Sequence, residues 1–460
     1  MGAGKSTIGP EVAERLGRSF IDLDRELERA VGRTIPELFE AVGEPGFRVQ
    51  EERQSLAALH LPEPAVIALG GGAVQTPSIR HALAERAFTV LLEVDPETAW
   101  KRTSSSGRPL AREEGEFHAL YERRRRMYDE VAEATAADAD GVVLAAGAVH
   151  VRVGAIEELE SLVPGEGAIA FVSDAHVDGI HGAAAQAALG QRVRSVHEVP
   201  SGEEAKTEGV VQRLWNEIEL DRDGVLVALG GGTTTDVAGF VAASYLRGID
   251  WAPVPTTLVA QVDAAIGGKT GIDLKAGKNL VGAFHWPASV VIDPALLETL
   301  PESERREGMA EVVKTGLLAG EPLWELPTPE RVRRCAAFKT ALCLRDPLDR
   351  GARAQLNLGH TFAHALEAGA GYDGLTHGSA VALGLLAALR LSERSTDTVE
   401  EVLEPSPVRV DRERAWQALQ RDKKARDGEI HLVLLRDDGP VVEPRPADEV
   451  RAALDALIAD

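Results

Sequence analysis

The chain has 460 residues, enough for roughly two or three α/β domains of ordinary size. Its 73 Asp and Glu residues outnumber its 50 Lys and Arg residues, and the net charge of −23 argues against nucleic acid or an anionic membrane as a partner. The two cysteines, Cys335 and Cys343, cannot form a disulfide framework, and no apolar run is long enough to span a bilayer, so the sequence favours a cytoplasmic protein.

The first stretch, up to about residue 145, alternates helical patterns with short apolar strands, which predicts a parallel sheet covered by helices. The expected strands lie at 65–69, 89–94 and 141–144. Small residues at 145–148 form a joint before a new strand that begins at Val151, and we place a domain boundary there.

The rest of the chain changes from an α/β pattern to a helical pattern part-way along. A second α/β segment at 149–295 has expected strands at 168–173 and 224–229, whereas the residues after it form long helical patterns rich in Ala and Leu. These helices are expected near 303–319, 331–345, 355–369 and 378–394. The sequence therefore predicts an α/β plus α fold with three domains, at 1–145, 149–295 and 296–460.

The N-terminus carries the string Gly2-Ala3-Gly4-Lys5-Ser6-Thr7, which is the latter part of a phosphate-binding P-loop. In such a loop, backbone N–H groups surround the phosphates, while the Lys contacts phosphate oxygens and the Ser binds Mg²⁺. The full pattern has another Gly five residues before the Lys, preceded by a strand. We therefore expect the natural chain to start upstream of Met1.

Further motifs follow this loop in a set order: Phe20-Ile21-Asp22-Leu23-Asp24, Gly46-Phe47-Arg48, Gly70-Gly71-Gly72, Gly107-Arg108-Pro109-Leu110, and Arg124 ahead of Tyr128. With them, residues 1–144 resemble shikimate kinase, which has a P-loop and a parallel sheet. The resemblance implies that ATP binds Gly2, Gly4, Lys5, Ser6, Thr7 and Arg108. It also implies Mg²⁺ on Ser6 and Asp22, catalysis by Asp24, and shikimate on Asp24, Arg48, Gly70, Gly71, Gly72 and Arg124.

Three histidines and one glutamate in the last third of the chain are candidate metal ligands: Glu311, His360, His364 and His377. His360 and His364 lie four residues apart and so share one face of a helix, a spacing that is common in zinc sites. Single histidines are more often ordinary core or surface residues, so the spacing alone leaves both interpretations open. Catalytic zinc usually takes three protein ligands and keeps one position open.

Cations and glycines in the second segment and the helical part indicate anion and nucleotide sites. The cations are Arg247, Lys269, Lys278, Lys314, Lys339, Arg353, Lys423 and Lys424, and any one of them could also be an ordinary surface residue. The strand at 224–229 leads into Gly230-Gly231-Gly232 and Asp236, and glycines between a strand and a helix can hold a pyrophosphate. We interpret the similar Leu69-Gly70-Gly71-Gly72 as the same local solution used twice rather than as a repeat.

Ordered motifs from about residue 149 to 460 resemble 3-dehydroquinate synthase. They are Pro200-Ser201-Gly202-Glu203-Glu204-Ala205-Lys206, Gly230-Gly231-Gly232 with Asp236, Tyr245-Leu246-Arg247-Gly248, Pro255-Thr256-Thr257, Gln261-Val262-Asp263, Gly267-Gly268-Lys269-Thr270, Gly277-Lys278-Asn279, Ala310-Glu311-Val312-Val313-Lys314, Leu356-Asn357-Leu358-Gly359-His360 and Arg421-Asp422-Lys423-Lys424. The resemblance implies an α/β nucleotide-binding domain followed by a mainly helical metal-binding domain.

The resemblance to 3-dehydroquinate synthase also implies the site residues. It implies zinc or cobalt on Glu311, His360 and His377, with His364 beside the metal as a group that handles protons and contacts phosphate. It implies NAD on Asp174, Glu203, Lys206, Gly230, Gly231, Gly232, Asp236, Thr256, Thr257, Lys278 and Asn279. It implies substrate phosphate and carboxylate on Asp263, Lys269, Lys314, Lys339, Arg353, Asn357 and Lys423, with Arg247 contributed by the other subunit of a homodimer.

The implied activity is conversion of 3-deoxy-D-arabino-heptulosonate 7-phosphate to 3-dehydroquinate and phosphate, joined in one chain to ATP-dependent phosphorylation of shikimate. Other sugar phosphate cyclases and polyol dehydrogenases of the same fold are the alternatives, with the kinase half as a non-catalytic module. Two positions depart from the synthase pattern. Ser379 stands where the family generally has Glu two residues after the last metal histidine, and Asp349 stands in a stretch that is usually rich in Glu.

Overall fold

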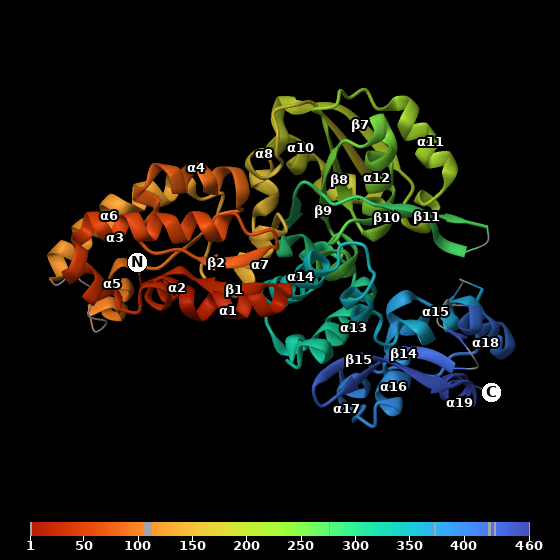
Figure 1. Ribbon diagram of the computed structural model, residues 1–460. Coiled ribbons are helices and arrows are strands. Elements are labelled where there is room, and N and C mark those ends of the chain that lie inside the picture. Colours follow the sequence, from red (N-terminus) through yellow and green to blue (C-terminus); the bar gives the residue numbers. More distant parts are fainter. Residues whose placement is uncertain are drawn as a thin grey trace. The chain divides into compact units, whose positions relative to one another are not determined.

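The computed structural model describes residues 2–104, 113–275, 277–371, 374–421, 425–426 and 429–459. The chain divides into two compact units, Met1–Gly147 and Ala148–Asp460, and each is described by itself (Figure 1). Among the described residues, no helix is long and apolar enough to cross a membrane.

The first unit is an α/β domain in which helices surround short parallel strands. Its strands are β1 (Ser19–Asp22), β2 (Ala65–Ala68), β3 (Val90–Leu92) and β4 (Ala134–Ala136). Its helices are α1 (Lys5–Leu16), α2 (Leu23–Val31), α3 (Ile35–Leu59), α4 (Pro77–Arg86), α5 (Pro96–Ser104), α6 (Glu114–Val131) and α7 (Ala139–Ala146). β1 pairs in parallel with β2, and β3 pairs in parallel with β4, as the alternating pattern predicts.

The expectation of a strand at 141–144 in this unit is wrong. Residues 141–144 lie inside the helix α7, not in a strand. The side chain of Asp138 accepts a hydrogen bond from the Gly141 amide and so caps the start of this helix, while Val143 and Leu144 are buried. A run of four apolar residues fits a buried helix as well as a buried strand, and the capping Asp decides for the helix.

The α/β part of the second unit is built on a parallel sheet of four strands in the order β7-β6-β8-β9. These strands are β6 (Ile169–Asp174), β7 (Val193–Val199), β8 (Val225–Gly230) and β9 (Asp250–Pro255). Every residue of β6 and β8 is buried, because two apolar clusters cover opposite faces of the sheet. The strands expected at 168–173 and 224–229 are therefore confirmed.

Helices and a separate hairpin complete this α/β part (Figure 1). The helices are α8 (Leu159–Leu162), α9 (Ala175–Val177), α10 (Ala183–Leu189), α11 (Glu208–Glu217) and α12 (Gly232–Ser244). The antiparallel hairpin consists of β10 (Lys269–Leu274) and β11 (Gly277–Phe284), and β12 (Val290–Ile292) pairs in parallel with β5 (Val149–Val151). The turn from β8 into α12 carries Gly230, Gly231 and Gly232, and the β10–β11 hairpin carries Lys278 and Asn279, all of which are expected to bind NAD.

The last part of the chain is mainly helical, as expected, but it also holds a small antiparallel sheet that the helical patterns did not predict. Its helices are α13 (Glu302–Ala319), α14 (Thr328–Arg345), α15 (His360–Gly369), α16 (His377–Leu391), α17 (Asp397–Leu403), α18 (Arg412–Arg421) and α19 (Ala447–Asp455). The sheet consists of β13 (Ala425–Arg426), β14 (Glu429–Arg436) and β15 (Gly439–Pro446). Side chains of α13, α15, α16, α18, β14 and α19 share one apolar core.

The helix expected over 355–369 is interrupted. Residues 352–357 form a 3₁₀ helix, and α15 starts only at His360, after Gly359 adopts a φ of 77°. A side chain at Gly359 would come within 2.8 Å of the Leu385 backbone nitrogen, so this turn lies directly against α16. The break brings the start of α15, where His360 is found, close to the neighbouring helices.

Candidate active sites

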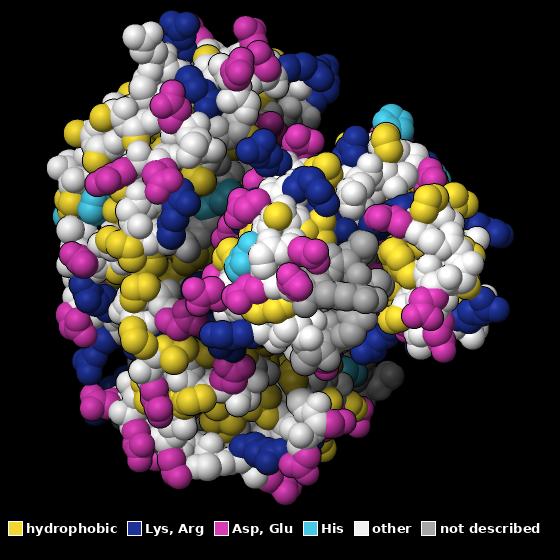
Figure 2. Space-filling view, turned by 90° about the vertical axis from the view of Figure 1, so that its left-hand side faces the viewer, with side chains coloured by type: hydrophobic (Ala, Val, Ile, Leu, Met, Phe, Trp, Pro, Cys, Tyr) yellow, Lys and Arg dark blue, Asp and Glu magenta, His cyan; other side chains and the backbone are white. Residues whose placement is uncertain are grey.

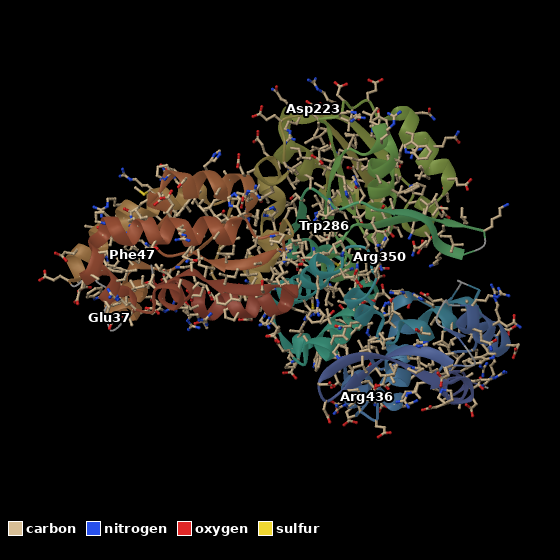
Figure 3. The ribbon with its side chains drawn as sticks, viewed as in Figure 1. Glu37, Phe47, Asp223, Trp286, Arg350 and Arg436 are labelled. Atoms are coloured by element: carbon tan, nitrogen blue, oxygen red, sulfur yellow. The ribbon has the colours of Figure 1, made fainter. Side chains whose placement is uncertain are left out.

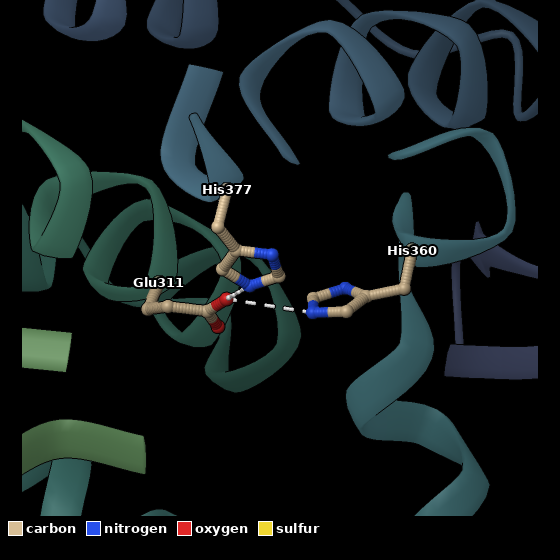
Figure 4. Close-up of side chains that lie close together, drawn as sticks. All are labelled: Glu311, His360 and His377. Carbon is tan, nitrogen blue, oxygen red and sulfur yellow. Dashed lines mark hydrogen bonds and ion pairs between the residues drawn. The ribbon is translucent and has the colours of Figure 1, made fainter. Parts of the chain in front are cut away.

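Three side chains from three helices form a candidate metal centre in the second unit. Glu311 of α13, His360 of α15 and His377 of α16 offer ligand atoms that all lie within 4.8 Å of one another (Figure 4). The Glu311 Oε1 atom is 3.4 Å from His360 Nε2 and 3.2 Å from His377 Nε2. One carboxylate and two imidazoles are a ligand set known from catalytic zinc sites, so these residues fit the metal.

Hydrogen bonds behind the cluster turn both imidazole rings toward it. The His360 Nδ1 atom lies 3.2 Å from the Leu358 carbonyl oxygen, and His377 Nδ1 lies 3.1 Å from Glu367 Oε1. When each Nδ1 atom donates its proton to such an oxygen, each Nε2 atom keeps a lone pair for a metal. These partners thus favour, for each ring that binds a metal, the tautomer that keeps its proton on Nδ1.

The charges at the cluster shift the pKa values of its members in different directions. Burial alone would raise the pKa of Glu311, but the Lys314 ammonium and the two imidazoles outweigh it and hold that pKa well below its ordinary value. Burial, aided by Lys314, lowers the pKa of His360 to about 4. For His377, the carboxylates of Glu311 and Glu367 outweigh burial and raise the pKa to about 10. A metal that bound at this cluster would therefore displace a proton from His377.

Buried cations lie beside the metal centre. Lys314 contacts Glu311 and lies 3.3 Å from Asp263 Oδ2, and Lys339 also contacts the Asp263 carboxylate. Arg353 is only 2% exposed and donates from Nη1 to the Gly267 carbonyl oxygen at 2.9 Å. A side chain on Gly267 would collide with the Arg353 guanidinium, so the glycine is required for this approach. Together these groups form a cationic wall that suits a phosphate or carboxylate.

The remaining residues expected around the substrate are more exposed than these buried cations. Lys269 is half exposed, and its Nζ atom lies 2.5 Å from Asp349 Oδ2. The exposed His364 ring packs edge-on against His360 with ring centroids 5.7 Å apart, outside the ligand cluster. Asn357 ends the 3₁₀ helix before α15. Arg247 is exposed and has a φ of 71°, which is unusual for a residue other than glycine.

A cradle for a dinucleotide lies at the carboxyl ends of β6, β8 and β9. Gly231 precedes the first turn of α12, and a side chain there would come within 3.1 Å of the Thr257 methyl group. Thr256 is 5% exposed, and its hydroxyl finds no hydrogen-bond partner within the described part of the chain. Asp174, at the end of β6, accepts hydrogen bonds from the His176 and Val177 amides at 3.1 Å. The glycines, the start of a helix and the buried hydroxyl fit a bound pyrophosphate and ribose.

The other residues expected at this cradle form one charged network with the hairpin. Lys206, 3% exposed, donates to Asp236 Oδ2 at 2.8 Å and to the Asn279 side chain. Lys278 lies 3.0 Å from Glu203 Oε1. Burial raises the pKa of Asp236 to about 6 against the opposing effect of Lys206. The structure thus brings all five of these expected residues together.

The P-loop of the first unit borders a large pocket. The Ser6 hydroxyl donates to Asp22 Oδ2 at 2.7 Å, which puts the two expected Mg²⁺ ligands side by side. Gly4 has a φ of 85° and precedes α1, which begins at Lys5. The pocket has a volume of about 1020 Å³, and Gly4 and Thr7 are among its lining residues. That volume accommodates a nucleotide.

The expected shikimate residues gather at the Gly70-Gly71-Gly72 turn. A side chain on Gly70 would come within 2.9 Å of Asp24 Oδ1, and one on Gly72 would collide with the Arg48 guanidinium. Arg124 of α6 is 6% exposed, and burial lowers its pKa. A buried arginine, a partly buried arginine and a carboxylate beside exposed backbone groups suit a small polyhydroxy acid.

Sequence reasoning missed several residues that the structure places at these sites. Glu51 is buried beside Arg48 at 2.5 Å, and burial raises its pKa. Arg102 lines the P-loop pocket and donates to the Gly2 carbonyl oxygen at 3.3 Å. Glu367 contacts the metal cluster through His377. Arg102 and Glu367 stand in no recognisable sequence motif. Glu51 lies one helical turn after Arg48 and could have been found by that spacing. The expected residues Arg108 and Lys423 lie outside the described residues.

Comparisons with known proteins agree with both units. The chain matches the shikimate kinase family over residues 1–146, the N-terminal 3-dehydroquinate synthase family over 196–307 and the C-terminal one over 308–425. The 3-dehydroquinate synthase of Bordetella pertussis is 39% identical over 341 residues, which cover 67% of this chain and 95% of the relative. The chain belongs to the 3-dehydroquinate synthase family.

The fused arrangement also has a relative. The bifunctional shikimate kinase/3-dehydroquinate synthase of Thermotoga maritima is 32% identical over 486 residues, which cover 96% of this chain and 95% of the relative. The resemblance of the two parts to a kinase and a synthase is thereby confirmed. The alternative cyclases and dehydrogenases are not favoured, because relatives named 3-dehydroquinate synthase reach 39–41% identity.

Solved structures of related cyclases share the fold of the second unit. A 2-deoxy-scyllo-inosose synthase in complex with carbaglucose-6-phosphate, NAD⁺ and Co²⁺ is 25% identical, covers 66% of this chain and 95% of its own, and has a TM-score of 0.60. The 2-epi-5-epi-valiolone synthase of Streptomyces hygroscopicus with NAD⁺ and Zn²⁺ bound is 25% identical, covers 67% of this chain and 96% of its own, and has a TM-score of 0.59.

Proposed function

We propose that the second unit converts 3-deoxy-D-arabino-heptulosonate 7-phosphate to 3-dehydroquinate and phosphate, and that the first unit phosphorylates shikimate with ATP. The observation that carries the first activity is a three-ligand metal cluster beside a wall of buried cations. Hydride chemistry and phosphate chemistry need these two features in one place. The same proposal assigns residues 1–145 to the kinase domain, 149–295 to the NAD-binding domain and 296–460 to the metal-binding domain.

Glu311, His360 and His377 would hold zinc or cobalt, and residues of the dinucleotide cradle would hold NAD. When bound, the metal supplies a Lewis acid for a substrate hydroxyl, and NAD supplies a reversible hydride acceptor. Asp174, Thr256 and Thr257 would orient the dinucleotide at the ends of the strands. Lys206 and Asp236 would fix the hairpin residues Lys278 and Asn279 beside it.

The cationic wall would bind the anionic groups of the substrate. Lys314, Lys339 and Arg353 are buried and would hold phosphate and carboxylate in a fixed pose, which lowers the cost of orienting the reacting carbon. Asp263 holds the two lysines next to each other. His364, exposed beside His360, would exchange protons with the substrate and the departing phosphate. Lys269, Asn357 and Lys423 complete the proposed set.

We also include a homodimer in the proposal, with Arg247 of each subunit completing the phosphate site of the other. Arg247 and Leu246 both have positive φ values of 71° and 48°, and both are exposed. Two adjacent strained residues persist only when something beyond their own turn compensates for the strain. A cytoplasmic location fits the two free, buried thiols of Cys335 and Cys343.

For the kinase unit, Lys5 and Arg108 would contact the ATP phosphates, and Ser6 and Asp22 would hold Mg²⁺. Asp24 would accept the proton of the attacking shikimate hydroxyl. Arg48 and Arg124 would bind the shikimate carboxylate against the Gly70-Gly71-Gly72 turn. Phosphoryl transfer needs little more than positioned cations and an oriented hydroxyl, which this set supplies.

Two assays on the whole chain test the proposal. Incubation with the heptulosonate phosphate is expected to release inorganic phosphate only when NAD is present, and a metal chelator is expected to stop the release. Formation of ADP is expected only when shikimate is added with ATP and Mg²⁺. Full phosphate release after metal removal contradicts the proposed metal centre, and ADP formation that ignores shikimate contradicts the kinase assignment.

A further inference from the structure

The helix that carries His377 is capped by a carboxylate from a neighbouring helix. The residue before α16, Thr376, accepts no capping hydrogen bond. Glu307 of α13 takes this part instead: its Oε2 atom accepts from the Gly378 amide at 2.5 Å, and its Oε1 atom accepts from the Thr376 hydroxyl at 2.6 Å. One carboxylate therefore holds both the backbone and the cap residue at the start of α16.

This contact satisfies a need of the helix itself. The first amides of any α-helix have no partner within the helix, and a negative charge near that end is favourable. In α16 the amide of Gly378, the second residue of the helix, obtains its partner from Glu307. The start of α16 is thus tied to α13 at the point where its first residue, His377, projects toward Glu311.

The two helices also touch at the backbone. A side chain on Gly378 would come within 2.5 Å of the Glu307 carbonyl oxygen and 2.6 Å of its α-carbon. Glu307 and Glu311 are one helical turn apart, so one face of α13 presents one carboxylate to the start of α16 and the next to the His377 ring. One turn of α13 therefore fixes the distance between His377 and Glu311, because Glu307 holds the start of α16 and Glu311 faces the His377 ring.

Ser379 lies at the same helix end as the contact made by Glu307. The resemblance to the synthase family implies Glu at this position, two residues after His377, where this chain has Ser379. Here Ser379 offers only a hydroxyl, whose oxygen lies 2.8 Å from the Thr376 hydroxyl oxygen. The carboxylate that position 379 lacks is present at the same helix end, but it comes from Glu307.

We propose that Glu307 is a positioning residue for the metal centre: it replaces the carboxylate absent at 379, fixes the start of α16 and so holds His377 at ligand distance from Glu311. The inference rests on the proposed metal site. Glu307 itself does not touch the metal. Its loss is expected to loosen the ligand set rather than to remove a ligand.

Titration of the metal-free protein with Co²⁺, followed by the visible absorption of the bound ion, tests this inference. Glu307→Ala is expected to weaken Co²⁺ binding by about tenfold or more, the usual effect of losing a group that orients a ligand. Glu307→Gln keeps the size of the side chain but not its charge, and its affinity is expected to fall as well. The double variant Glu307→Ala/Ser379→Glu returns a carboxylate to the same helix end and is expected to regain most of the lost affinity.

Glu404→Ala is the matched control, because it removes an exposed carboxylate that pairs with Arg306, the neighbour of Glu307, at 3.1 Å. It is expected to bind Co²⁺ as the unaltered chain does. A lower melting temperature with unchanged Co²⁺ affinity in both Glu307 variants would reduce the contact to a structural cap and overturn the inference. Failure of Ser379→Glu to restore affinity in the double variant overturns it too.

The Co²⁺ titrations distinguish a wrong metal site from a wrong role for Glu307. If Glu311→Gln binds Co²⁺ as tightly as the unaltered chain, the proposed metal site is wrong, and the inference falls with it. If Glu311→Gln loses Co²⁺ while Glu307→Ala and Glu307→Gln keep it, only the inference falls.

Discussion

At the scale of single residues, the partner of a metal ligand is expected to matter nearly as much as the ligand. Glu367 is 7% exposed and lies 3.1 Å from His377 Nδ1, where it receives the ring proton and leaves Nε2 for the metal. In Glu367→Gln the side-chain amide can present its NH₂ group and favour the other tautomer. We expect metal affinity to fall by about 10- to 100-fold, measured by competition with a chelating dye.

Glu401→Gln on the same part of the chain is the control for this change, because Glu401 is exposed on α17, a helix that carries none of the three candidate ligands. It is expected to leave the affinity unchanged. Equal affinities for Glu367→Gln and Glu401→Gln would show that the tautomer of His377 is set without Glu367.

A second residue-scale prediction concerns pH. Burial, aided by the nearby Arg353 guanidinium, lowers the pKa of Lys339 from 10.5 to about 7. Below pH 7 its ammonium is charged and binds the anionic substrate; above pH 7 the charge is progressively lost. The synthase kcat/KM is therefore expected to fall as pH rises through about 7, since this quantity reports the free enzyme.

Lys339→Arg tests the origin of that fall, because a guanidinium stays protonated over the whole accessible range. Profiles of kcat/KM between about pH 6 and 9 are expected to lose this limb in the variant, whatever its absolute rate. A limb near pH 7 that persists in Lys339→Arg must come from another group. Lys269→Arg, at a half-exposed lysine, serves as the comparison.

These residues also show what the sequence could predict. The spacing of His360 and His364 indicates one helical face, yet His364 lies outside the ligand cluster, which draws Glu311 and His377 from two other helices. Contacts between residues far apart in the chain depend on packing, so only the family resemblance could name the three-residue set. Glu307 and Glu367 act through other residues, and no motif identifies them.

At the scale of elements, the approach of α16 to α13 depends on one missing side chain. The β-carbon of Gly378→Ala would lie within 2.5 Å of the Glu307 carbonyl oxygen, so α16 has to move away. We expect a loss of about 1–3 kcal/mol in the free energy of unfolding, as for other overpacked contacts, together with weaker metal binding. Chemical denaturation of the second unit and Co²⁺ titration measure the two effects.

Gly209→Ala provides the matched control, because Gly209 lies within the helix α11 and a β-carbon there meets nothing within 4 Å. It is expected to be neutral or to stabilise the helix by up to about 1 kcal/mol. If Gly378→Ala behaves like Gly209→Ala in both measurements, the two helices are not held as closely as described.

Elements with strong local signals were predictable, and those without were not. β8 is a short apolar run that leads into a glycine turn, and β6 begins with four apolar residues and ends in Ser173 and Asp174, so the identity of both strands follows from the sequence. The helix α7 was predicted as a strand because four apolar residues carry no period, and the helix over 355–369 was drawn through Gly359, whose positive φ ends it. The small sheet of β13, β14 and β15 lies in a stretch for which no particular helix or strand was expected.

At the scale of the whole molecule, charge is distributed unevenly between surface and sites. Acidic and basic side chains are interspersed over the face shown in Figure 2, and the exposed Asp223 lies at the outer edge of the second unit in Figure 3. By contrast, Lys206, Lys314 and Arg353 are each at most 3% exposed. A net charge of −23 is therefore compatible with anionic substrates, because the cations that would bind them are kept inside.

The candidate metal ligands of the two activities lie in different units, which predicts that the two activities can be removed one at a time. A chelator selective for zinc, used in excess Mg²⁺, is expected to abolish phosphate release from the heptulosonate phosphate and to leave shikimate-dependent ADP formation intact. Ser6→Ala is expected to do the reverse. It removes the hydroxyl that contacts Asp22 and would bind Mg²⁺, and it is expected to lower kinase turnover by about a hundredfold, since the charge stabilisation supplied by a metal is worth several kcal/mol.

Ser104→Ala is the control for Ser6→Ala, because Ser104 ends α5 and its hydroxyl donates only to the Lys101 carbonyl oxygen, at 3.3 Å, among the described contacts. Both assays run on the same preparation, so a fall in protein quality lowers both rates together. Loss of synthase turnover in Ser6→Ala, or loss of kinase turnover on zinc removal, would show that the units depend on each other. Loss of one activity alone in each case is the result expected of two separate sites, because among the described residues the candidate ligands of each metal come from a single unit.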